Sequence, residues 1–83
     1  MKSQITGGQL RAARALLGWS VRELSMLCGV SKSAISRAEK LNGKIRMQTR
    51  TLDAVVRALE EHGIEFLSAE GLRINRNKSY TRL

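Results

Sequence analysis

Apolar residues recur at helical spacing along most of the chain, and residues that begin or end helices separate the repeats. Thr6 can begin a helix that runs to about Leu17, because a threonine oxygen accepts a backbone N–H of the first turn. Gly18 supplies the stop, since glycine adopts the left-handed backbone that follows many helices. The buried stripe of this helix is predicted to be Leu10, Ala13, Leu16 and Leu17.

Two shorter helices are predicted next, each with a serine at its start. Ser20 caps a helix from Val21 to Cys28, and Gly29 follows it. Ser31 caps a third helix over residues 31–40. The apolar side of the helix from Val21 to Cys28 is predicted to be Val21, Leu24, Leu27 and Cys28.

The remaining pattern predicts one more helix and a pair of strands. The helix runs from Gln48 or Thr49 to His62, is ended by Gly63, and buries Leu52, Val55, Val56 and Leu59. Residues 64–67 and 72–75 predict two short strands around a turn at Glu70 and Gly71. The chain thus divides into a helical part (1–63), a β ribbon (64–75) and a flexible basic tail (76–83). The fold class is mainly α, with four to five short helices and a short C-terminal β-hairpin or strand.

The third helix has an unusual polar face. Ala34, Ile35 and Ala38 lie on one side of it. The other side combines short hydroxyls and long cations without an acid, whereas a solvated helix usually mixes both signs of charge. Such a face suits an anionic partner. Its members are Lys32, Ser33, Ser36, Arg37 and Lys40.

Charge along the chain supports the same interpretation. The 83 residues include 15 Lys and Arg against 7 Asp and Glu, a net charge of +8. Residues 1–50 carry ten basic and two acidic side chains, while residues 51–83 carry five of each. The whole excess therefore lies in the first part, which is expected to face a polyanion. No stretch approaches 18 apolar residues, so nucleic acid is favoured over a membrane.

No enzyme is predicted. The single Cys28 and the single His62 provide neither a zinc site nor a nucleophile and base pair, and no glycine pattern matches a phosphate-binding loop. Cys28 is interpreted as a small core residue. No cofactor or metal is expected. The lone cysteine and the absence of a signal-peptide pattern predict a cytoplasmic protein.

The stretch "LRAARALLGWSVRELSMLCGVSKSAISRAEK" resembles the lambda-repressor and Cro type of DNA-binding domain, the XRE family of bacterial and phage transcriptional regulators. The match covers about residues 9–59 and rests on helix phasing, the turn glycine Gly29, the small Ser25 and the apolar Ile35. Family members join the positions of Arg14 and Glu39 in a salt bridge between the first and third helices. Val21 stands where the family commonly has glutamine, which puts one phosphate contact in doubt.

The resemblance implies that residues 1–63 are a helix-turn-helix domain whose third helix enters the major groove of an operator. Arg37 is the leading candidate for reading a base, because its planar fork can bond guanine O6 and N7 together. The expected base contacts are Ser31, Lys32, Ser33, Ser36 and Arg37. The expected phosphate contacts are Ser20, Arg22, Lys40, Lys44 and Arg46, and the alternative for the last three is an ordinary solvated loop that is basic for solubility alone.

A homodimer is expected because a domain this small is marginal alone and because a two-stranded ribbon has unpaired edges. The residues predicted to form the dimer surface are Ile64, Phe66, Leu72 and Ile74. The alternative is a hairpin that folds back to cover its own helices.

The predicted function is sequence-specific regulation of transcription, as a repressor that acts as a homodimer on double-stranded DNA in the cytoplasm, at the nucleoid. An antitoxin or anti-activator that works by binding protein is the alternative. A fragment of a transposase or recombinase is a third interpretation. The acid-free face of residues 31–40 favours DNA, because a protein partner would not require it.

Overall fold

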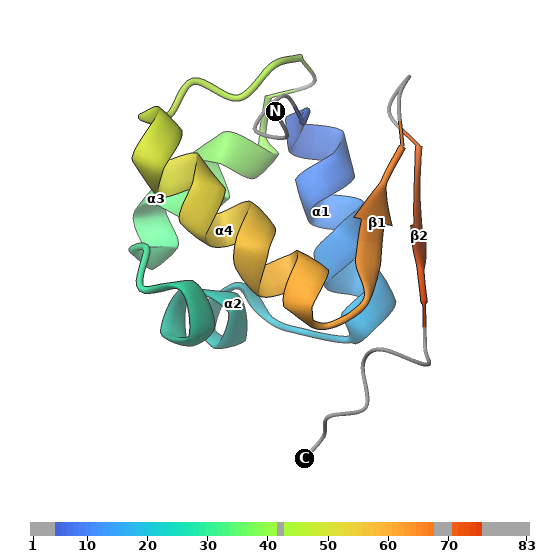
Figure 1. The fold of residues 1–83 in the computed structure, drawn as a ribbon. Coiled ribbons are helices and arrows are strands. Elements are labelled where there is room, and N and C mark those ends of the chain that lie inside the picture. Colours follow the sequence, from blue (N-terminus) through green and yellow to red (C-terminus); the bar gives the residue numbers. More distant parts are fainter. Residues whose placement is uncertain (1–4, 42, 68–70, 76–83) are drawn as a thin grey trace.

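The structure, a computed structural model, describes residues 5–41, 43–67 and 71–75. Four helices precede a two-stranded antiparallel sheet (Figure 1). The elements are α1 (Gly7–Leu17), α2 (Val21–Cys28), α3 (Lys32–Glu39), α4 (Thr49–Glu61), β1 (Ile64–Phe66) and β2 (Leu72–Ile74). The prediction of a mainly α fold with a short C-terminal hairpin is confirmed.

Local capping explains where the first three helices begin. The side-chain oxygens of Thr6, Ser20 and Ser31 each accept the backbone N–H three residues ahead, at 3.0, 3.0 and 3.2 Å. Gly18 and Gly29 follow α1 and α2 with φ of +71° and +74°, as the sequence predicts. The α4 helix differs, because its N-cap residue makes no side-chain capping bond.

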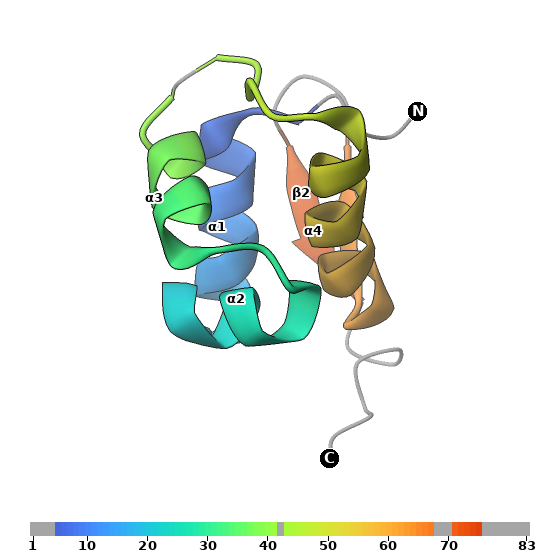
Figure 2. The same ribbon diagram turned by 90° about the vertical axis from the view of Figure 1, so that its left-hand side faces the viewer.

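The helices enclose one apolar core. The α1 helix packs against α3 and β2, α2 packs against α3 and α4, and α4 packs against β1. Figure 2 shows the same arrangement from the side on which α3 lies. The α1 helix therefore joins α3 to the sheet. The core side chains are Ile5, Leu10, Ala13, Leu24, Val30, Ile35, Ala38, Ile45, Leu52, Val55, Val56, Ala58, Leu59 and Ile64.

Two core predictions are wrong, because Leu16 and Leu27 are largely exposed. Both lie at the border of an apolar stripe, where periodicity gives the direction of a side chain but not how far its neighbours extend over it. Each predicted strand is one residue shorter in the structure. The predicted turn residue Glu70 and the predicted tail 76–83 lie outside the described residues.

The ribbon closes the core of its own chain. Ile64 is 1% exposed, and Phe66, Leu72 and Ile74 pack against the core. On the opposite face, Arg73 Nε and Glu65 Oε1 form an ion pair at 2.6 Å. The side chain of Ile64 is thus occupied within one copy, and the other three residues predicted for a dimer surface are partly buried against the same core.

The outer edge of β2 keeps its hydrogen-bonding groups directed away from β1. Leu67 N–H donates to Gly71 C=O, and Asn75 N–H donates to Gly63 C=O. Such bonds join every second residue pair of an antiparallel ladder. In the register Ile64↔Ile74 and Phe66↔Leu72, both β2 residues therefore direct their N–H and C=O groups outward.

Candidate nucleic-acid interface

The α2 and α3 helices form a compact two-helix unit. Residues 29–31 connect them, with Gly29 in the left-handed region. Across this turn, Ser25 Oγ donates to Val30 C=O at 2.6 Å, and Val30 is buried. The small side chain of Ser25 thus fixes the turn, and Ser31 then starts α3 through its capping bond. This is the arrangement that a helix-turn-helix motif requires.

The α3 helix carries buried residues that pack on the domain and exposed residues that face solvent. Ile35, Ala38 and Glu39 are buried, whereas Ser36 is half-buried. The other predicted base-contact residues and Lys40 are exposed. These exposed residues are Ser31, Lys32, Ser33, Arg37 and Lys40.

Other elements also carry exposed cations. Arg22 on α2 is exposed, as are Lys44 and Arg46 in the loop between α3 and α4. Ile45 lies between those two cations and is buried, and its N–H donates to Ile5 C=O at 3.4 Å. Burial of Ile45 therefore leaves both neighbours directed to solvent. Arg50, in the first turn of α4, is also exposed and was not among the predicted contacts.

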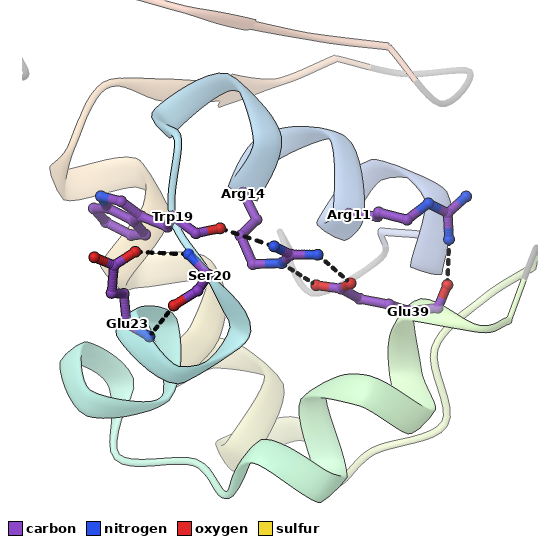
Figure 3. A network of polar contacts seen from close by, with 6 residues as sticks. All are labelled: Arg11, Arg14, Trp19, Ser20, Glu23 and Glu39. Carbon is purple, nitrogen blue, oxygen red and sulfur yellow. Dashed lines mark hydrogen bonds and ion pairs between the residues drawn. The ribbon is translucent and has the colours of Figure 1, made fainter.

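The structure brings Arg14 and Glu39 into direct contact, as the resemblance implies. Arg14 Nε and Nη2 donate to the two carboxylate oxygens at 2.7 and 2.8 Å, and Nη1 donates to Trp19 C=O at 2.8 Å (Figure 3). The side chains of Arg14 and Glu39 are 19% and 8% exposed. The hydrogen bonds to Glu39 raise the pKa of the Arg14 guanidinium. This bidentate pair fixes the end of α3 to α1.

Two other α1 residues that sequence reasoning missed also hold α3. Arg11 donates a hydrogen bond to the backbone carbonyl of Glu39 (Figure 3). A Cβ at Gly7 would lie 2.1 Å from Leu41 O and 2.3 Å from Ala38 O, so only glycine permits this approach. A glycine at the first position of a predicted helix was the available indication for Gly7, whereas nothing local indicated the partner of Arg11.

The start of α2 carries an acid. Ser20 and Glu23 form a reciprocal capping box, in which Glu23 Oε1 accepts the Ser20 N–H at 2.7 Å (Figure 3). The negative charge of Glu23 beside Ser20 disfavours a phosphate there. Ser20 is therefore a weaker candidate for a phosphate contact than the exposed cations.

The described residues indicate no other chemistry. Among them, no three His, Cys, Asp or Glu side chains gather where they could hold a metal ion. Cys28 packs partly against the core, and burial raises the pKa of its thiol, which disfavours the nucleophilic thiolate. None of the described helices combines the length and apolar character needed to cross a bilayer.

Comparison with known proteins agrees with this geometry. A family model described as a helix-turn-helix domain matches residues 6–66, which include all four helices and β1. No curated protein and no solved structure shows a significant match. Domains of this kind bind DNA and are typically not catalytic, so DNA is the partner that the match indicates. With a two-helix unit of the required geometry and a match over most of its length, this chain belongs to the helix-turn-helix domain family.

Proposed function

We propose that this protein is a sequence-specific transcriptional regulator of the XRE type that binds double-stranded DNA as a homodimer. The observation that carries the proposal is the exposed, acid-free face of α3, which is rigidly held to α1 by the Arg14 and Glu39 pair. Repression is the simplest outcome, because occupation of an operator is sufficient to exclude other proteins. An excess of positive charge over the first fifty residues would also bring DNA to this face.

Base reading is assigned to the exposed face of α3. Arg37 offers a planar fork for guanine, and Lys32 offers a less directional donor near the N-terminus of the helix. Ser31, Ser33 and Ser36 can accept more than one base, so preference at their positions is expected to be weak.

Phosphate contacts are assigned to four exposed cations. Lys40, Lys44 and Arg46 lead into α4, and Arg22 lies on α2. The first amides of α4 have no side-chain cap and lie beside these cations in the sequence, so they can support a phosphate as well. These contacts would set the position of the domain on the duplex without reading sequence.

The homodimer is assigned to the outer edge of β2. Two copies that pair there in antiparallel fashion would form a four-stranded sheet and satisfy the outward groups of Leu72 and Ile74. Such a dimer would be two-fold symmetric, as required for two half-sites about one helical turn, or roughly 34 Å, apart.

A protein-binding role, as an antitoxin or anti-activator, is the second candidate. One observation favours it: Met26 is 74% exposed on α2, and Leu27 beside it is also exposed. Neighbouring exposed apolar side chains can form the patch that a protein partner contacts. This face differs from the polar face of α3, so the two roles make separable predictions.

The assignments of Arg37 and Lys44 predict different losses. Arg37→Ala should weaken binding to the preferred sequence by about 1–3 kcal/mol and relax preference at one base position. Lys44→Ala should weaken all sequences alike and reduce the salt slope of log Kd by about one unit. The measurement is selection of bound duplexes from a random pool, followed by titrations at several salt concentrations.

Equal losses on preferred and random duplex for both variants would contradict this division of roles. A parent protein whose affinity for random duplex does not depend on salt would exclude DNA as the partner and favour the protein-binding role. Met26→Ser serves as the control, because it changes the exposed apolar face and leaves the cations in place.

Ile74→Pro is expected to convert the dimer to a monomer. Proline removes the N–H that Ile74 directs outward, while the bonds between β1 and β2 remain. Ile74→Ala is the matched control, because it loses similar apolar contact but keeps the N–H. Sedimentation equilibrium distinguishes them: dimeric Ile74→Ala with monomeric Ile74→Pro supports the strand edge, and dimerisation of both locates the interface elsewhere.

A further inference from the structure

Gln9 makes an unusual set of hydrogen bonds. It is 4% exposed and lies at the third position of α1. Its Oε1 accepts the Thr6 N–H at 3.0 Å, which completes a capping box. Its Nε2 donates to Leu67 C=O at 3.1 Å and to Gly71 C=O at 2.8 Å. One side chain therefore joins the start of α1 to Leu67 after β1 and to Gly71 before β2.

The same short segment also holds the DNA-facing side of the molecule. Gly7 packs against the backbone carbonyls of Ala38 and Leu41 at the end of α3. Gly7 N–H donates to Gly43 C=O at 3.3 Å, and Thr6 pairs with Lys44 in an isolated antiparallel bridge. Residues 6–9 thus contact the end of α3 and its following loop on one side and the hairpin on the other.

Gln9 holds the ribbon through directional hydrogen bonds, which the apolar core contacts do not provide. The strands pack on the helices through apolar side chains, whose contacts are not directional. The two bonds from Gln9 are directional, and they hold the end of the ribbon farthest from the Gly63 connection to α4. They therefore restrict how the ribbon is oriented on α1.

We propose that Gln9 is a positioning residue that sets the angle between the ribbon and α3, and through it the spacing of DNA half-sites that a dimer accepts. This inference rests on the proposed homodimer on DNA. A rotation of about 10° acting over the roughly 34 Å between recognition helices displaces the second helix by ~6 Å. That displacement exceeds the rise of about 3.4 Å for one base pair, so a small rotation changes the accepted spacing.

Two substitutions separate this role from helix capping. Gln9→Glu keeps an oxygen for the Thr6 N–H but cannot donate to Leu67 and Gly71 when ionised, and it directs a carboxylate at their carbonyls. Thr6→Ala has the opposite effect, because it removes the oxygen that caps α1 and keeps both Gln9 donor bonds. Gln9→Ala, which introduces no charge, is the substitute if Gln9→Glu does not fold. It also removes the oxygen that accepts the Thr6 N–H, so Thr6→Ala serves as its control for lost capping.

The experiment uses the full chain and a palindromic duplex selected by the parent from a random pool. The same duplex with one base pair inserted between the half-sites, and a duplex with a single half-site, are titrated in parallel. The parent should prefer the original spacing by about tenfold, within the usual range of coupling between sites. Gln9→Glu should reduce this preference to about threefold or less and leave affinity for the single half-site unchanged, whereas Thr6→Ala should keep the preference despite a lower Tm.

The possible outcomes are distinguishable. Retention of the parental preference by Gln9→Glu, or by Gln9→Ala as its substitute, would overturn the positioning role and leave the dimer on DNA standing. An equally large loss of spacing preference in Thr6→Ala would also overturn the positioning role, because general loosening of α1 would then explain the effect. A parent that shows no spacing preference would refute both the proposed homodimer and this role.

Discussion

Gly7→Ala is expected to destabilise the protein by about 3 kcal/mol, which for a domain of this size lowers Tm by roughly 12–24 °C. The added Cβ would lie 2.1 Å from Leu41 O and 2.3 Å from Ala38 O, far inside van der Waals contact. Both atoms belong to the backbone, so no side-chain rotation relieves the clash, and the start of α1 must move away from the end of α3. Thermal unfolding followed by circular dichroism measures the loss.

Gly8→Ala provides a matched control one residue away. A Cβ at Gly8 meets nothing closer than Thr6 Oγ1 at 3.7 Å, which is ordinary contact. Alanine there should stabilise the protein by about 0.4–1 kcal/mol, because it restricts the unfolded chain and favours the helix. If both variants melted alike, the close approach of α1 to α3 would not exist in solution.

Arg14→Ala is expected to cost about 3–5 kcal/mol, since it leaves the nearly buried carboxylate of Glu39 without its bidentate partner. Much of this loss is the desolvation of a remaining charge. The double variant Arg14→Met with Glu39→Met should therefore recover most of the stability, because it leaves no charge unpaired.

Chemical denaturation of Arg14→Met, Glu39→Met and the double variant tests this pair. A coupling energy close to zero in the double-mutant cycle would show that the contact contributes little. Arg11→Ala is the control, because it removes one hydrogen bond to the Glu39 backbone carbonyl and leaves the carboxylate paired. Its loss should be about 1 kcal/mol.

Local rules were sufficient for most of the fold. The caps Thr6, Ser20 and Ser31 fixed the starts of three helices, and Gly18 and Gly29 fixed the ends of two, because these interactions span only a few residues. Burial of Leu16 and Leu27 was predicted wrongly because it depends on how far other helices extend. That information is tertiary and does not appear in the periodicity of one helix.

Contacts between residues far apart in the sequence limited how much of the candidate site could be predicted. The polar face of α3 was predicted from spacing alone, and the Arg14 and Glu39 pair from resemblance. The bonds of Gln9 to Leu67 and Gly71 span 58 and 62 residues, and no local pattern indicates partners so distant. Sequence reasoning likewise assigned Ser20 to phosphate without the competing Glu23, since the capping box was not considered.

The residues that hold α3 in the fold are different from those that it exposes, and this separation bears on how DNA preference could evolve. Ile35, Ala38 and Glu39 hold the helix in place, whereas Lys32, Ser33 and Arg37 are exposed. Substitutions at exposed sites usually change stability by no more than about 0.5 kcal/mol. With the base contacts proposed above, changes at these three positions would alter the preferred operator at little cost in stability, and a library randomised there should yield folded proteins with altered targets.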